Sequence, residues 1–114
     1  MLLDIFNMAP KAVAGFKGGE GEALVRIHQD DMGKVAQITL PVGASIGLHT
    51  HDTSAEVVYV IAGRGIVLED EAPNGDPIVV EAGTVTYCPK GHSHSLINNS
   101  DADLVVLGVI PELG

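Results

Sequence analysis

The apolar runs of this sequence are short, and turn-forming residues interrupt them at regular intervals. Fourteen of the 114 residues are glycine and six are proline, and no segment has the spacing of a convincing amphipathic helix. Short strands with turn signals between them are typical of an all-β sandwich or barrel. The pattern predicts strands over residues 23–29, 34–40, 45–51, 55–61, 66–68, 78–81, 84–88, 93–98 and 104–110.

The length of the chain predicts one domain, residues 1–114, with one modest core. Residues 1–22 fit an N-terminal arm or edge strand followed by a glycine-rich loop, and residues 23–111 fit the barrel. Cys88 is the only cysteine, which excludes an internal disulfide. The first ten residues have no basic start of the kind that signal peptides carry, so we expect a cytoplasmic protein.

The charge balance limits the class of partner. The chain has 6 lysines and arginines against 15 acidic residues, a formal net charge of −9. Such a surface repels phosphate backbones and anionic lipid, and the basic residues form no local patch. No apolar run is long enough to span a bilayer. We therefore expect a small-molecule ligand or substrate, and neither nucleic acid nor membrane.

Three side chains near the middle of the sequence suggest a metal site. His49 and His51 lie two apart in an expected strand, so both imidazoles are predicted to share one face. The Asp52–Ser54 turn is expected to send the chain back antiparallel, with Glu56 roughly opposite His51, about 5 Å away at Cβ. Neutral imidazoles and a carboxylate suit divalent metals. The competing interpretation is that these histidines are structural.

Two sets of spaced residues resemble the two signature motifs of the cupin superfamily. The first set is Gly43, five residues, His49-Thr50-His51, four residues, Glu56, six residues, Gly63. The second set is Gly83, five residues, Pro89-Lys90-Gly91, two residues, His94, three residues, Asn98. Every specified position matches, so the chain is similar to a small single-domain cupin.

The resemblance implies a double-stranded β-helix, the jelly-roll barrel. It also implies that His49, His51, Glu56 and His94 hold one divalent transition metal per chain, which in this superfamily is Mn, Fe, Ni, Co, Cu or Zn. Single-domain members are commonly homodimers that exchange N-terminal strand contacts. Asn98 is expected to bind backbone at a strand end.

Other residues are candidates for the pocket. Gln37 either donates hydrogen bonds inside the barrel or faces outward. Tyr87 and Cys88 point to opposite faces of one strand, so one of them is expected to face the cavity. His92 shares the parity of His94 if its strand begins that early, and is a catalytic candidate beside Glu56. The alternative for His92 is an exposed loop position.

One apolar stripe is expected on the outside of the barrel. Val57, Tyr59 and Ile61, here called the outer stripe, alternate with residues that should face inward. A stripe of this kind is exposed in a monomer, so it predicts a second sheet layer or a dimer interface.

The sequence leaves two classes of function open. The favoured class is a metal-dependent enzyme of the dioxygenase, isomerase or lyase type that acts on a small oxygen-rich metabolite. The alternative is a non-enzymatic binding or sensor module that holds a sugar or an organic acid in the same pocket. A metal that only ties the barrel walls together is a third, structural interpretation.

Overall fold

The computed structural model describes all 114 residues. Its strands are β1 (Lys11–Ala14), β2 (Glu22–Asp30), β3 (Gly33–Leu40), β4 (Ser45–Thr50), β5 (Glu56–Ala62), β6 (Arg64–Glu69), β7 (Ile78–Glu81), β8 (Val85–Cys88), β9 (Ser93–Ile97) and β10 (Leu104–Pro111). Three short 3-10 turns accompany them: η1 (Ile5–Asn7), η2 (Phe16–Gly18) and η3 (Pro73–Gly75). All the expected strands are present within two residues of the expected ends, and β1 is an additional edge strand. None of the helical turns has the length and apolar character needed to cross a bilayer.

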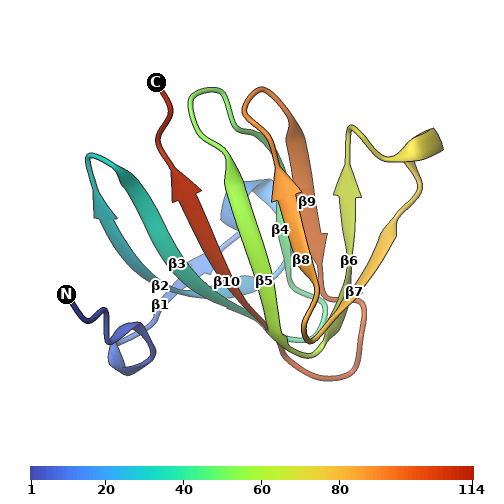
Figure 1. Cartoon of the computed structure of the whole chain (residues 1–114). Helices are drawn as coiled ribbons and strands as arrows, with labels where there is room; N and C mark the ends of the chain where they lie inside the picture. The colour runs from blue at the N-terminus through green and yellow to red at the C-terminus, as the bar shows by residue number, and fades with distance from the viewer.

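The strands form two sheets that face each other (Figure 1). The six-stranded sheet has the order β1-β2-β3-β10-β5-β8, and the four-stranded sheet has the order β4-β9-β6-β7. From β3 onward the chain crosses between the sheets at almost every connection, which is the winding of a jelly roll. The expected all-β, double-stranded β-helix is therefore confirmed.

The expected hairpin around residues 52–54 is wrong. β4 pairs with β9, whereas β5 pairs with β10 and β8, so the two segments belong to different sheets. The turn carries the chain across the barrel instead of returning it along the same sheet. Turn residues mark a change of direction but do not specify which strand becomes the partner. His51 and Glu56 therefore approach each other across the interior.

The interior tapers in a regular way along two neighbouring strands, β3 and β10. Their inward-facing residues are directly opposed in register as the pairs Leu40–Leu104, Ile38–Val106 and Ala36–Gly108. Leu40 and Leu104 are fully buried in the core cluster. Because the side chains shrink from one pair to the next, the barrel is filled at one end and leaves space at the other.

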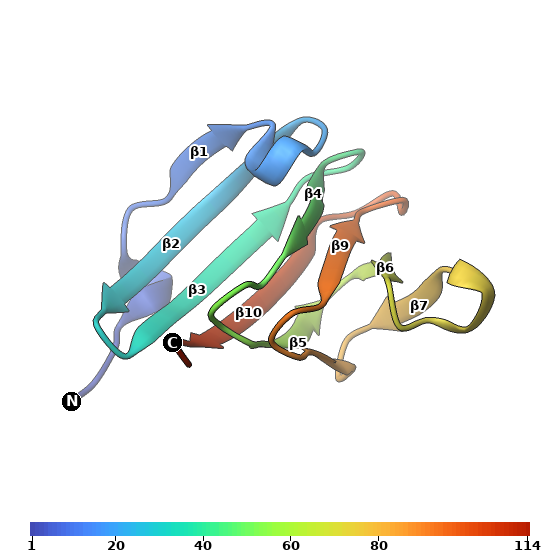
Figure 2. The same cartoon turned by 90° about the horizontal axis from the view of Figure 1, so that it is seen from above.

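The N-terminal arm covers part of the outer face of the six-stranded sheet. Arg26 on β2 donates to the Met8 carbonyl at 2.7 Å and to Gln37 Oε1 at 2.6 Å. Ile5 of η1 is buried, and η1 contacts β2. Figure 2 shows β1 and β2 extending past the four-stranded sheet. The arm thus covers one side of this face, while the opposite side, over β5 and β8, stays open.

Candidate metal centre

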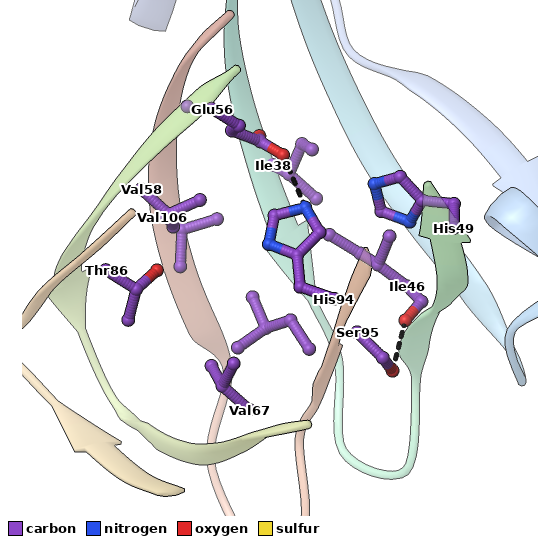
Figure 3. Close-up of a pocket in the computed structure, with 12 residues that line it drawn as sticks. Ile38, Ile46, His49, Glu56, Val58, Val67, Thr86, His94, Ser95 and Val106 are labelled. Atoms are coloured by element: carbon purple, nitrogen blue, oxygen red, sulfur yellow. Dashed lines mark hydrogen bonds and ion pairs between the residues drawn. The ribbon is translucent and has the colours of Figure 1, made fainter. Parts of the chain in front are cut away.

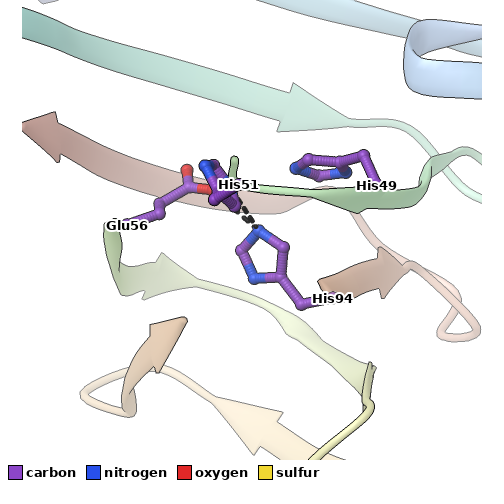
Figure 4. A group of neighbouring side chains, drawn as sticks. All are labelled: His49, His51, Glu56 and His94. Atoms are coloured by element: carbon purple, nitrogen blue, oxygen red, sulfur yellow. Dashed lines mark hydrogen bonds and ion pairs between the residues drawn. The ribbon is translucent and has the colours of Figure 1, made fainter. Parts of the chain in front are cut away.

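Four ligand-type side chains converge at the open end of the barrel (Figure 4). His49 lies on β4, and its strand partner in register is His94 on β9. His51 follows the end of β4, and Glu56 begins β5 in the opposite sheet. One ligand atom from each of the four lies within 4.8 Å of those of the others. The two sheets together therefore present three imidazoles and one carboxylate to a single point.

The distances fit a bound cation. His51 Nε2 lies 3.0 Å from His94 Nε2 and 3.2 Å from Glu56 Oε1, and His94 Nε2 lies 2.9 Å from the same oxygen. Donor atoms at ~2.1 Å from one ion are about 3 Å apart when they are neighbours in an octahedral shell. Two unprotonated imidazole nitrogens at 3.0 Å repel each other, so a proton or a metal ion must sit between them.

Neighbouring oxygens orient two of the rings. His49 Nδ1 donates to the Gly47 carbonyl at 2.7 Å, and this fixes the tautomer that leaves Nε2 with a free lone pair. His51 Nδ1 lies 2.9 Å from Ser54 Oγ. Second contacts of this kind hold metal-binding histidines in most proteins. The sequence analysis missed Gly47 and Ser54, although both are close to the motif histidines along the chain.

The electrostatics favour the metal-binding forms of Glu56 and His49. Burial by itself would raise the pKa of Glu56, but hydrogen bonds from His51 and His94 and their positive charge outweigh it and lower that pKa to about 2. Burial lowers the pKa of His49, against the opposing effect of its bond to Gly47. A carboxylate and a neutral imidazole are the protonation states that bind divalent metals.

Gly108 provides the space that Glu56 occupies. A Cβ built on Gly108 would lie 2.6 Å from Glu56 Oε2, too close for any real contact. The φ angle of Gly108 is not positive, so other residue types can adopt its backbone conformation. The requirement for glycine is therefore one of space, since glycine inside a strand often marks a close approach.

Two cavities adjoin the four ligands. The inner one has a volume of about 20 Å³, lies among apolar side chains of the core and touches His49, Glu56 and His94 (Figure 3). It has room for about one water molecule. The outer one is a cleft of about 410 Å³ lined by His49, His51 and Glu56. A ligand larger than a water molecule therefore reaches the four side chains from the outer cleft and not from the inner cavity.

Three of the four other pocket candidates are turned away from both cavities. Gln37 is completely buried on the outer face of β3, bonded to Arg26 and Thr39, because the inward positions of this strand are even-numbered. Tyr87 is 56% exposed on the outside. His92 precedes β9 in the Pro89–His92 turn, where it contacts Asp70 at 3.2 Å and Glu71 at 3.5 Å. The inward parity assumed for His92 required a strand that begins earlier.

Cys88 takes the inward position of its strand but lines neither cavity. It is the register partner of Glu56 and is buried. Burial and the nearby charge of Glu56 raise the pKa of the thiol to about 11. Cys88 is thus a packed and unreactive neighbour of the site. Asn98 is buried and donates to the carbonyls of Leu40 and Ala102, which confirms its expected structural role.

Comparison with known proteins places these features in a family. Residues 36–110 match the family model described as a cupin domain. An oxalate-binding protein of Thermotoga maritima is 30% identical over 116 residues, 96% of this chain and 93% of the relative. A predicted oxalate decarboxylase from the same organism has a crystal structure with a TM-score of 0.89, at 28% identity, covering 99% of this chain and all of that one. A double-stranded beta-helix protein from Klebsiella pneumoniae, 18% identical, superposes with a TM-score of 0.73 over 87% of this chain and 84% of its own.

Proposed function

This chain belongs to the cupin family, and from that premise we propose that it binds a small oxygen-rich acid through one divalent transition metal. His49, His51, Glu56 and His94 would hold the ion. The observation that carries the proposal is the convergence of His51, His94 and Glu56 donor atoms at 2.9–3.2 Å from one another. The donor set, nitrogen and carboxylate oxygen without thiolate, suits Mn, Fe, Co, Ni, Cu or Zn and does not select among them.

The ligand class is supported by the cleft and by the relatives. The cleft opens directly on three of the four ligand residues, so a molecule in it can reach the ion. When bound, a divalent ion supplies a Lewis-acid site for carboxylate or carbonyl oxygens. A relative that aligns with nearly the whole chain is named an oxalate-binding protein, which makes oxalate the first acid to test.

Binding without chemistry is the function we favour, because the non-ligand catalytic candidate of the sequence lies outside the cleft. A general acid or base must lie within hydrogen-bond reach of the proton that it transfers. His92, the only non-ligand candidate from the sequence, is paired with Asp70 and Glu71 outside the cleft. The three imidazoles and the one carboxylate at the centre would themselves be metal ligands, so they would not be free to transfer protons.

The alternative is an enzyme that uses the same centre. Glu56 lines the cleft and stays ionised because its pKa is about 2, and it is a weak proton acceptor as long as His51 and His94 hold it. Release of the Glu56 carboxylate from the ion would let it accept a proton. One solved relative is described as a predicted oxalate decarboxylase, so loss of carbon dioxide is the reaction to assay first.

Elemental analysis and calorimetry test the proposal together. Protein purified without a chelating tag is expected to carry about one transition metal per chain, and His51→Ala is expected to carry almost none. Oxalate should bind to the metal-loaded protein and not to the metal-free one. Failure of both the metal and oxalate to bind would reject the proposal, and release of carbon dioxide from oxalate would favour the enzyme.

We also propose that a second copy of the chain covers the outer stripe. Val57 and Tyr59 are 37% and 45% exposed, and their strand partners on β8, Tyr87 and Val85, are 56% and 60% exposed. These residues form a continuous apolar area on the open side of the six-stranded sheet. Val57→Lys should halve the mass measured by light scattering, whereas Val79→Lys on β7 should not. An unchanged mass for Val57→Lys would exclude this face.

A further inference from the structure

The cleft next to the metal centre has an apolar wall. Val25 and Ile27 on β2 pair in register with Ile38 and Ala36 on β3, and all four side chains line the cleft. We call these four residues the cleft wall. Phe16 of η2 and Ile110 of β10 add apolar surface on either side of it. The metal ligands therefore form one end of a cavity whose remaining lining combines this apolar wall with polar and charged side chains.

Packing of the core accounts for Ala36 and Ile38, which belong to the core cluster, but not for the rest of the wall. Ile27 is 40% exposed, and Val25 and Phe16 are only partly buried against the core cluster. β2 lies on the side of the six-stranded sheet that extends past the four-stranded sheet (Figure 2), and Ile27 on this strand stays exposed. Contiguous apolar surface in a concave site is typical of a ligand-binding cavity, where the ligand supplies the missing contacts.

Two lysines offset part of the negative charge around the wall. Lys34 on β3 and Lys17 on η2 both line the cleft, and neither forms an ion pair. Asp52 and Glu112 also line it, at exposed positions. In a chain with a net charge of −9, two unpaired lysines make this cavity less repulsive to an anion than the rest of the surface. Their aliphatic stems also extend the apolar surface.

The size of the cleft argues against a very small dianion as its only occupant. Cavities of about 300–1,000 Å³ typically enclose drug-sized molecules, and the cleft has about 410 Å³. Oxalate has no apolar part, so it would leave the wall and Phe16 in contact with water.

We propose that the cleft accepts a medium-sized carboxylic acid that carries an apolar tail, for which 2-oxo acids of increasing chain length are suitable probes. The acid group lies at the end formed by His49, His51 and Glu56, and the tail lies along the cleft wall. The inference rests on the proposed function, because the acid group needs the metal, but it adds a preference that the metal alone does not provide.

A series of 2-oxo acids that differ only in chain length tests the inference. The protein, loaded with one equivalent of Co²⁺, is titrated calorimetrically with pyruvate, 2-oxohexanoate and 2-oxooctanoate, and with oxalate in parallel. Affinity is expected to rise by about fourfold for each methylene that the wall buries. Equal affinities for the three 2-oxo acids would overturn the inference but not the proposed function. Failure of all four acids to bind would overturn both.

A substitution in the wall gives the matched control. Ile27→Thr keeps the β-branched shape at an exposed strand position and removes apolar contact. It should reduce the advantage of 2-oxooctanoate over pyruvate at least about threefold, with pyruvate affinity and cobalt content unchanged. Ile78→Thr changes the same residue type at 36% exposure on β7, away from the cleft, and should keep the full advantage. If Ile27→Thr also keeps the full advantage of 2-oxooctanoate over pyruvate, the tail does not lie along the cleft wall.

Discussion

The two ends of the barrel interior use the same strands for opposite purposes. On β5 the inward residues change from Val60 to Val58 to Glu56, and on β9 from Leu96 to His94. On β10 the end opposite the site has Leu104, and the end at the site has Gly108. The packed end is dry and filled, whereas the ligand end contains buried polar groups and borders a cleft. A shift of two to four residues along a strand is therefore enough to separate stability from function.

The largest expected effect is a loss of metal affinity at the ligand end, with the fold unchanged. His94→Ala removes one of the two nitrogens that face each other at 3.0 Å. Metal affinity should fall by at least about 100-fold, because loss of a direct ligand costs more than loss of the groups that orient it. Metal content after dialysis measures this, and circular dichroism should show an unchanged β spectrum. Full metal content in both His94→Ala and His49→Ala would mean that the site is wrongly located.

A matching change at the packed end should have the reverse result. Leu104 is fully buried and opposes Leu40. Leu104→Ala should lower the free energy of unfolding of the metal-free protein by about 3 kcal/mol. The substitution leaves a new cavity between the two sheets, and the sheets cannot close over it. Chemical denaturation measures the loss. Metal stoichiometry should remain at the wild-type value, and a parallel loss of metal would show that the two ends are coupled.

Substitution of Gly108 tests where along β10 the packed end of the interior gives way to the ligand end. The added methyl group of Gly108→Ala would displace the Glu56 carboxylate, so metal affinity should fall about tenfold, with a smaller change in stability. Glu56→Asp in the same protein shortens the acid and should restore part of the affinity. Val106→Ala, on the same inward face, should destabilise the fold and leave metal affinity unchanged. No recovery in the double variant would indicate that Gly108 acts through the backbone.

The smallest expected effect concerns Cys88, which is the register partner of Glu56 but lines no cavity. Its pKa of about 11 in the folded protein exceeds the ordinary value of 9.0. The fold therefore favours the neutral thiol, and this contribution is complete below pH 9 and lost as pH rises from 9 to 11. A two-unit shift corresponds to about 2.7 kcal/mol, but solvent screens the exposed carboxylates that contribute to it, so relative to Cys88→Ala the wild type should lose about 1 kcal/mol across this window in denaturation experiments. Parallel curves for the two proteins would place Cys88 in contact with water.

The sequence predicted the strands and the convergence of four candidate metal ligands because both leave local patterns. Short apolar runs between turn residues located nearly all the strands, and the two motifs located His49, His51, Glu56 and His94 in the chain. Pairing of strands left no such pattern, so the sequence wrongly joined the segments around residues 52–54 into a hairpin. It also left the inward side of Gln37 and of Tyr87 undecided, because parity gives relative faces only.

The cleft was beyond the reach of the sequence for a different reason. Apart from the motif residues and the turn between them, its lining comes from β2, β3, η2 and the last residues of the barrel, which no motif connects. Ile27 and Lys34 look like ordinary strand residues until the extension of β2 past the smaller sheet is known. The outer position of His92 likewise depended on where β9 begins, a boundary that composition does not define.

The place of β10 has a consequence for synthesis of the protein in the cell. This strand lies between β3 and β5 in the six-stranded sheet, yet it is made after both of them. Until residues 104–111 have left the ribosome, the nascent chain exposes the hydrogen-bonding edges of two long apolar strands. Exposed edges of this kind pair readily with other chains. A nascent chain on a ribosome that pauses just before this segment would therefore depend on a chaperone to keep these edges from pairing with other chains.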